Sequence, residues 1–210
     1  MIGKYKNLAH LLDHYCLVLA SGSPRRIFLL DEIGITYRQI IPDIHEDNNA
    51  HIDPHELATL LALKKAQAIL DRMGSDEIAL GCDTLVVLEG HILGKPSSPD
   101  EAFRMLNRLS GQKHTVCSGV ALVDRDGNEE SAYELSDVYF RDVSPEAIRN
   151  YVATGEPLDK AGSYGIQEQG VFLVDRVIGN IDNVIGLPRD LLDNLAAKMA
   201  VKKGLYGIGH

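Results

Sequence analysis

The fold of this chain is decided by residues 17–26, Leu-Val-Leu-Ala-Ser-Gly-Ser-Pro-Arg-Arg. The apolar residues at its start predict a buried strand that ends at a turn of small residues. Ser23 stands where a helix N-cap belongs, and Pro24 suits the first helical position. The two arginines that follow bring positive charge to a helix end that is itself partly positive. An anion such as phosphate bound at this turn would reconcile these features, and an ordinary capped helix with solvated arginines is the alternative.

Length and composition set the class of protein. The 210 residues suffice for one domain or two small lobes with a buried core. Hydrophobic residues make up 45% and charged residues 24%, as in an ordinary soluble globular protein. The net charge of −9 argues against a nucleic acid or an anionic membrane as the main partner, because both attract basic surfaces. An anion site must therefore be a local basic pocket.

Several features that the sequence lacks narrow this class further. No stretch approaches the ~20 apolar residues of a membrane span. Residues 1–14 lack the apolar segment of a secretory signal. Cys16, Cys82 and Cys117 are odd in number and have no C-x-x-C spacing, so neither a disulfide framework nor a zinc site is indicated. We expect three small core residues in a cytoplasmic protein.

Apolar periodicity and turn residues divide the chain into helices and strands. The predicted helices cover residues 8–14, 24–33, 53–73, 98–109, 144–153 and 188–199. The predicted strands cover residues 17–20, 37–41, 78–82, 85–88, 92–93, 115–124, 129–141 and 171–178.

The central pair of long strands, around the turn at residues 126–128, does not fit a purely parallel sheet. We therefore expect an α/β fold with a mixed, bent β-sheet and flanking helices that form two lobes around a cleft. The predicted boundaries are an N-terminal extension over residues 1–14, a single domain over 15–201 and a frayed tail over 202–210.

Two groups of acidic residues are candidates for chemistry. Asp83 ends a predicted strand beside Thr84, where a carboxylate can act as a general base or a metal ligand. The alternative for Asp83 is a carboxylate that caps a turn. Glu46 lies in an acidic loop with Asp43 and Asp47. Mg²⁺ uses one or two protein carboxylates together with substrate phosphates, whereas a solvated acidic loop is the alternative.

Two lysines and a glutamine are candidates for substrate binding. Lys65 on the second predicted helix and Lys95 in a Gly-Lys-Pro loop can neutralise a phosphate, or both can be surface lysines. Lys95 is the stronger candidate because its constrained loop fixes its direction. The polar, glycine-rich stretch 155–167 is typical of a functional loop, with a turn-rich connector as the alternative. At its end, the Gln167 amide can read a base edge or be an ordinary polar side chain.

The order of these signals along the chain carries more information than any one of them. The ordered motifs are residues 21–26 Ser-Gly-Ser-Pro-Arg-Arg, Glu46, 65–66 Lys-Ala, 83–84 Asp-Thr, 94–96 Gly-Lys-Pro, 154–157 Thr-Gly-Glu-Pro, 159–162 Asp-Lys-Ala-Gly, 164–167 Tyr-Gly-Ile-Gln and 183–188 Asn-Val-Ile-Gly-Leu-Pro. Together they resemble the Maf family over residues 16–200. The resemblance implies a mixed-sheet α/β fold like that of inosine triphosphate pyrophosphatases. It also implies a nucleoside triphosphate pyrophosphatase that cleaves between the α- and β-phosphates with a divalent metal cation.

The resemblance also assigns roles to individual residues. Asp83 becomes the proton acceptor for water or a ligand of the metal that activates the water, and the residues alone do not separate these roles. Glu46 and Asp83 would hold Mg²⁺ or Mn²⁺. The side chains implied to clamp the triphosphate are Ser21, Arg25, Arg26, Lys65 and Lys95.

Three positions point to one branch of the family. Arg25, Thr84 and Gln167 match the branch that acts on dTTP and UTP, rather than the branch that acts on 7-methyl-GTP. A site built to hydrogen-bond the edge of one base leaves its own polar groups unpaired when another base binds. Each unpaired group weakens binding by about 1–3 kcal/mol. The implied partners are a nucleoside triphosphate substrate and a second copy of the chain, with no nucleic acid and no membrane.

Two other functions stay open. A nucleotide-binding regulator of cell division or septation would hydrolyse its triphosphate only incidentally, and the family has been associated with inhibition of septum formation. A nucleotidyltransferase has a similar strand, glycine turn and arginine loop, and it would need an acceptor substrate. Turnover in water alone distinguishes both functions from a pyrophosphatase.

Overall fold

The computed structural model describes residues 2–44 and 53–206. Its strands are β1 Cys16–Ala20, β2 Tyr37–Gln39, β3 Glu77–Leu88, β4 His91–Leu93, β5 Lys113–Val123, β6 Glu129–Phe140 and β7 Val174–Ile178. They form a seven-stranded sheet in the order β2-β1-β3-β5-β6-β7, with β4 paired to β3. β1 is parallel to β2 and β3, whereas β4 is antiparallel to β3 and β7 is antiparallel to β6. The sheet is therefore mixed, as predicted.

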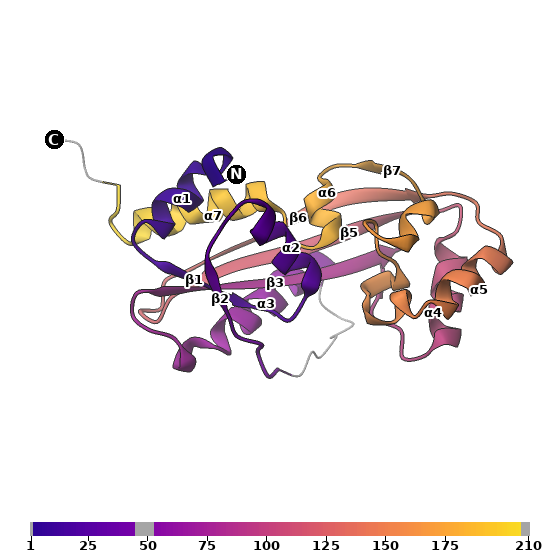
Figure 1. The fold of residues 1–210 in the computed structure, drawn as a ribbon, viewed down its shortest axis with the longest axis horizontal. Helices are drawn as coiled ribbons and strands as arrows, with labels where there is room; N and C mark the ends of the chain where they lie inside the picture. Colours follow the sequence, from indigo (N-terminus) through magenta and orange to yellow (C-terminus); the bar gives the residue numbers. More distant parts are fainter. Residues whose placement is uncertain (1, 45–52, 207–210) are drawn as a thin grey trace. The chain divides into compact units, whose positions relative to one another are not determined.

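Helices connect these strands in the described part of the chain (Figure 1). The α-helices are α1 Lys6–Leu12, α2 Pro24–Glu32, α3 Pro54–Gln67, α4 Pro99–Leu109, α5 Pro145–Ala153, α6 Ile181–Ile185 and α7 Arg189–Lys202. The short 3-10 helices are η1 Ile2–Lys4, η2 Leu70–Arg72, η3 Glu156–Asp159, η4 Ala161–Ser163 and η5 Gln169–Leu173. A mixed sheet with flanking helices confirms the predicted fold class, and the cleft stays a prediction.

The predicted helix starts are confirmed at three places where a polar residue precedes proline. The side chains of Asp53, Ser98 and Ser144 each accept a hydrogen bond from a backbone N–H in the first turn of their helix. The helix predicted over 53–73 ends earlier, at Gln67, and η2 follows as a separate turn.

The strand predicted to end at residue 82 does not end there, and this prediction is wrong. β3 continues without interruption from Glu77 to Leu88, so Asp83 lies inside a strand. The apolar and β-branched residues after Asp83 extend the strand, and the carboxylate is accommodated because it has an internal partner, described below.

The chain divides into two compact units. The first comprises Met1–Asp83, Ser118–Glu134 and Gly186–His210, and the second comprises Thr84–Cys117 and Leu135–Ile185. β3, β5 and β6 contribute residues to both units. One core cluster lies within the first unit and consists of Val18, Ala20, Ile40, Ala66, Ile69, Met73, Ala79 and Val123.

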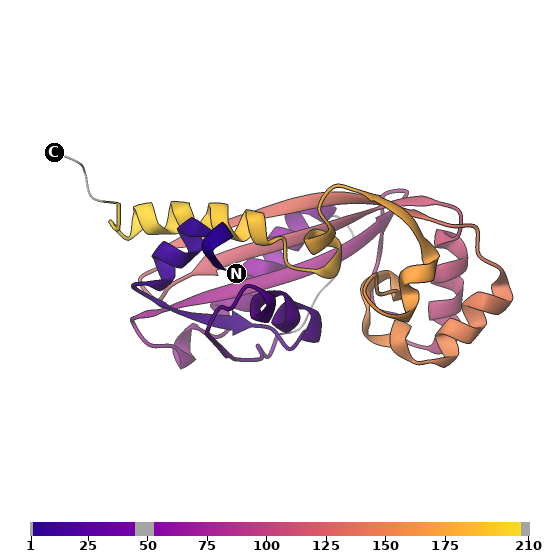
Figure 2. The same cartoon turned by 45° about the horizontal axis from the view of Figure 1, so that its top comes forward.

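In the first unit, the two ends of the described chain pack together. α1 and α7 lie side by side in both views (Figures 1 and 2). The Asp193 carboxylate on α7 accepts hydrogen bonds from Asn7 Nδ2 and from the Leu8 N–H, each with a length of 2.8 Å. Leu8 and Leu11 are fully buried. The predicted N-terminal extension thus contributes a packed helix to this unit.

The last helix runs beyond its predicted end at residue 199 and reaches Lys202. The following Lys203 ammonium donates to Asp124 Oδ2 at 2.7 Å and to Asp126 Oδ2 at 2.8 Å. The predicted frayed tail therefore begins with residues that are held in place, and residues 207–210 lie outside the described part.

The second unit has its own core, and its polar stretch is more regular than predicted. Its buried residues include Leu106 of α4, Ile148 and Tyr151 of α5, and Phe140 of β6. Within the stretch 155–167, residues 156–159 and 161–163 form the short helices η3 and η4, and residues 164–167 are not helical. The strand predicted over 171–178 starts only at Val174, because η5 occupies the residues before it.

The expectation that all three cysteines are core residues holds for two of them. Cys82 and Cys117 are buried, but Cys16 is exposed because it is the first residue of β1. In the part of the chain that the structure describes, no helix is long and apolar enough to cross a membrane.

Candidate active site

The turn between β1 and α2 is organised around the hydroxyl of Ser21. Its Oγ accepts a hydrogen bond from the Ser23 N–H at 3.2 Å and another from Arg26 Nη1 at 3.0 Å. Ser23 occupies the predicted N-cap position and Pro24 follows it, but the Ser23 side chain makes no capping hydrogen bond. The hydroxyl of Ser21 therefore performs the ordering role that we expected of Ser23.

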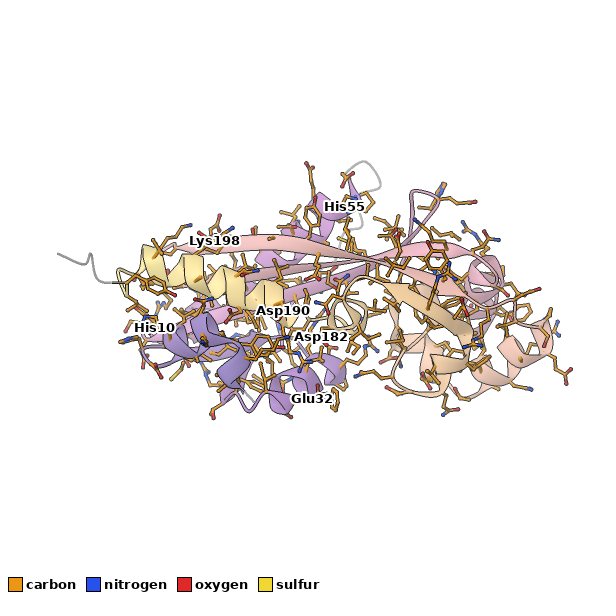
Figure 3. All side chains as sticks on the ribbon, turned by 90° about the horizontal axis from the view of Figure 1, so that it is seen from above. His10, Glu32, His55, Asp182, Asp190 and Lys198 are labelled. Atoms are coloured by element: carbon orange, nitrogen blue, oxygen red, sulfur yellow. The ribbon has the colours of Figure 1, made fainter. Side chains whose placement is uncertain are left out.

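Arg26 is a buried guanidinium, 8% exposed, that joins this turn to a distant segment. Its Nε donates to the carbonyl oxygen of Gly186 at 3.0 Å. A second contact joins α2 to the start of α7. Arg189 Nη1 lies 3.0 Å from Oε2 of Glu32, the last residue of α2, which is labelled in Figure 3. α2 is thus fixed to the start of α7, and the Arg26 guanidinium is oriented before any ligand arrives.

Strand register brings this turn close to Asp83. In the parallel pair of β1 and β3, Ala20 lies opposite Gly81. Ser21 is the next residue after Ala20, and Asp83 is two residues beyond Gly81. The Gln39 side chain also holds the turn, because its Nε2 donates to the carbonyl oxygen of Ser21 at 2.8 Å.

Asp83 forms a buried ion pair with Lys65 of α3. The Lys65 ammonium lies 2.5 Å from Asp83 Oδ1, and the two residues are 9% and 5% exposed. The helix can come this close because Gly81 has no side chain: a Cβ there would lie 2.0 Å from the carbonyl oxygen of Ala62. Gly119 has the same role, since its Cβ would lie 2.2 Å from the Ala58 oxygen.

The second oxygen of the Asp83 carboxylate has no hydrogen-bond partner among the described residues. Oδ2 is buried there without one, although buried carboxylate oxygens normally make hydrogen bonds. An acceptor held open in this way suits a water proton or a divalent cation. Among the described residues no three His, Cys, Asp or Glu side chains cluster as a metal site. A single carboxylate still fits Mg²⁺ or Mn²⁺, because substrate phosphates supply the other oxygen ligands.

Cys82 lies next to Asp83 and is not a nucleophile. Burial raises the pKa of its thiol to about 11, and the nearby positive charges of Arg26 and Lys65 oppose this only in part. The thiolate, which is the reactive form, is therefore scarce at neutral pH.

Three of the predicted site residues belong to the second unit. Thr84 is half-buried, whereas Lys95 and Gln167 are exposed. The loop of Lys95 is anchored because the Gly162 N–H donates to the Gly94 carbonyl oxygen at 3.1 Å. Gly162 has a φ of +67°, and a Cβ there would lie 2.9 Å from the Val86 side chain, so glycine is required.

The structure therefore brings together some of the predicted residues within the first unit: Ser21, Arg26, Lys65 and Asp83. Arg25 belongs to the same turn and is half-buried. Glu46 lies outside the described residues.

Sequence reasoning missed Gln39, which no motif contains, and the side chains of Tyr151 and Glu156 in the second unit. Glu156 lies in the motif 154–157, so its place there was the available signal.

Fold and site together define an α/β protein whose basic turn lies beside a buried lysine–aspartate pair. The family model described as Maf-like protein matches residues 16–199. The chain belongs to the Maf family.

Two similar proteins carry the name dTTP/UTP pyrophosphatase. A protein of Desulfitobacterium hafniense strain Y51, named dTTP/UTP pyrophosphatase, is 49% identical over 179 residues, which cover 83% of this chain and 81% of that protein. A dTTP/UTP pyrophosphatase of Moorella thermoacetica is 47% identical over 186 residues, which cover 88% of this chain and 95% of that protein. Among solved structures, a dITP/XTP pyrophosphatase of Mycobacterium abscessus has a TM-score of 0.45 and 15% identity, and the match covers 92% of this chain and 99% of that one.

Proposed function

We propose that this chain hydrolyses dTTP and UTP to the nucleoside monophosphate and pyrophosphate. The observation that carries the proposal is the Asp83 carboxylate: Lys65 holds one of its oxygens, and the other is buried without a hydrogen-bond partner in residues 2–44 and 53–206. The names of relatives at 41–49% identity support the reaction and its substrates.

Asp83 is the proton acceptor in the proposed reaction. The oxygen of a water molecule attacks the α-phosphorus, and the bond from this phosphorus to the oxygen that bridges the α- and β-phosphates breaks. Pyrophosphate leaves with the electron pair of that bond, and a proton of the water moves to Asp83 Oδ2. Lys65 holds Oδ1, so the orientation of the carboxylate is set before the substrate binds.

The basic side chains neutralise the triphosphate in this proposal. Arg26, Lys65 and Lys95 contact phosphate oxygens, and the Ser21 hydroxyl adds a hydrogen bond. Reactions at phosphorus depend mainly on positioning and on fixed charges, so side chains that are already held in place lower the barrier. The bonds of Arg26 to Ser21 and Gly186 support this role.

Asp83 and Glu46 are the residues proposed to hold Mg²⁺ or Mn²⁺. When bound, the cation neutralises phosphate charge and polarises the phosphorus. A carboxylate oxygen has two lone pairs, so Asp83 Oδ2 can accept a proton as well as contact a cation. Arg25, Thr84 and Gln167 are proposed to favour a pyrimidine base. The second copy of the chain, the cytoplasmic location and the regulation of septation stay predictions.

Pyrophosphate release across a panel of nucleotides tests the proposal. With Mg²⁺ or Mn²⁺, we expect faster turnover of dTTP and UTP than of ATP, GTP and 7-methyl-GTP, and no turnover after chelation with EDTA. Equal rates on every nucleotide, or a preference for 7-methyl-GTP, would overturn the substrate assignment. Tight binding with turnover well under ~1 s⁻¹, the low end of enzyme rates, would favour a regulator instead.

A further inference from the structure

Glu156 is the centre of a hydrogen-bond network in the second unit. Its Oε2 accepts from the Gln169 N–H at 3.0 Å, and its Oε1 accepts from the Gly170 N–H at 3.3 Å. Oε1 also accepts from the Tyr151 hydroxyl at 2.8 Å. Hydrogen bonds to an ionised carboxylate are stronger than those between neutral groups, so this one side chain holds the backbone at residues 169–170.

Tyr151 extends the network to the other side of Gln167. Its hydroxyl accepts a hydrogen bond from the Gly165 N–H at 3.2 Å while it donates to Glu156. Burial raises the pKa of Tyr151 well above its usual value, so the hydroxyl keeps the proton that it donates. Hydrogen bonds therefore hold the backbone two residues before Gln167, at Gly165, and two and three residues after it, at Gln169 and Gly170.

Close packing leaves the bracketed segment little room to shift. A Cβ at Gly170 would lie 2.4 Å from the Gly165 carbonyl oxygen and 2.6 Å from the Tyr151 hydroxyl. A Cβ at Gly165 would lie 2.9 Å from Cε of Lys160. The buried Lys160 ammonium in turn donates to the Glu156 carbonyl oxygen at 2.8 Å.

The start of the segment is anchored as well, whereas Gln167 itself faces solvent. Tyr164 is 6% exposed, its hydroxyl lies 2.8 Å from His114 Nε2, and its ring packs edge-on against Phe140. Gln167 is exposed. A side chain that is presented from a rigid, tethered backbone suits the reading of a ligand better than a simple connection between helices would.

We propose that Glu156 and Tyr151 are positioning residues that set base selectivity by holding Gln167. The inference rests on the proposed function, because it assigns to Gln167 the recognition of a pyrimidine edge. When the segment shifts, the amide loses its hydrogen bonds to the matching base, while a base that never made those bonds loses nothing. The variants therefore lose selectivity rather than general activity.

Two variants and a matched control test this proposal. Glu156→Gln turns one acceptor into a donor that faces backbone N–H groups, and Tyr151→Phe removes the hydroxyl while it keeps the ring. Glu168→Gln is the control, because it removes the same charge in the same segment, and the Glu168 carboxylate accepts none of the hydrogen bonds described above. We expect the ratio of kcat/KM for dTTP to that for ATP to fall about tenfold in both variants, the equivalent of one hydrogen bond.

The readouts separate positioning from a general structural role. We expect the loss to appear in KM for dTTP and UTP, and the control to keep the wild-type ratio. Because the two residues belong to one network, the double variant should lose no more than the single variant with the larger loss. An equal loss of kcat/KM on every nucleotide would overturn the proposal.

Hydrogen exchange gives a readout that does not depend on turnover. We expect faster exchange at the amides of residues 165, 169 and 170 in Glu156→Gln and Tyr151→Phe than in Glu168→Gln. Unchanged exchange would contradict the proposal that Glu156 and Tyr151 hold these amides. A wild-type protein that releases no pyrophosphate would instead overturn the proposed function. The two failures are thus distinguishable.

Discussion

The two units hold their candidate site residues in opposite ways. In the first unit the functional groups are themselves buried, with Arg26, Lys65 and Asp83 at most 9% exposed. In the second unit Lys95 and Gln167 are exposed, and buried neighbours hold the backbone that carries them. Buried charges with fixed partners suit a step that every nucleotide shares, whereas the exposed amide of Gln167 on a fixed backbone suits discrimination between bases. Substitutions of Arg26, Lys65 and Asp83 should therefore lower turnover on all substrates, whereas substitution of Gln167 should change the ranking of substrates.

The largest expected effect is that of Asp83→Asn. Loss of the proton acceptor should lower pyrophosphate release about 10³-fold, within the range for a general base, and by the same factor for dTTP, UTP and ATP. Nucleotide binding, measured by calorimetry, should persist. The exposed Asp71→Asn serves as the control and should keep wild-type turnover. A loss of turnover that differs between dTTP, UTP and ATP would contradict the assignment of the first unit to the shared chemical step.

Lys65→Met should have the next largest effect, on stability. The variant leaves a buried carboxylate without its ammonium, and the removal of one partner of a buried ion pair costs about 3–5 kcal/mol. Urea unfolding measures this loss. Lys64→Met, on the exposed face of the same helix, should change the free energy of unfolding little. Addition of Asp83→Asn to Lys65→Met should restore part of the stability, and no restoration would contradict the pairing.

The third prediction concerns pH and the buried interior of the second unit. Burial lowers the pKa of His114 to about 4, against 6.5 for an exposed histidine. Between these values the unfolded chain binds more protons than the folded chain, so stability falls as the pH falls from 6.5 toward 4. At pH 5 the loss relative to pH 7 is about 2 kcal/mol.

Replacement of the titrating ring tests this prediction. His114→Gln should remove about 2 kcal/mol from the difference in unfolding free energy between pH 7 and pH 5, as measured by urea titrations at both values. His91→Gln, at an exposed position, should leave the difference unchanged. An unaltered pH dependence in His114→Gln would mean that this histidine is not held neutral.

The smallest effect is expected for Gln167→Ala, which tests directly whether the second unit governs selectivity. Loss of the amide should lower the preference for dTTP over ATP about tenfold, with turnover of ATP unchanged. Gln169→Ala is the matched control, because its backbone N–H still donates to Glu156. A uniform loss of activity in Gln167→Ala would place this residue with the buried chemistry of the first unit.

Prediction from sequence succeeded where the signal is local. Proline after a polar cap predicted the starts of α3, α4 and α5, because capping depends on residues within one turn. It failed at Asp83, which was expected to end a strand. A carboxylate inside a buried strand is tolerated only with a partner, and that partner, Lys65, lies on another element.

Ordered motifs and short-range periodicity were enough to predict the family, the mixed α/β architecture and the turn at residues 21–26. The orientation of the Arg26 guanidinium, the open oxygen of Asp83 and the support of Gln167 become apparent only in the folded structure. These features depend on contacts between residues far apart in the chain: Arg26 with Gly186, Lys65 with Asp83, and Glu156 with residues 169–170. Such contacts arise from the packing of separate segments against one another, which spacing along the chain does not encode.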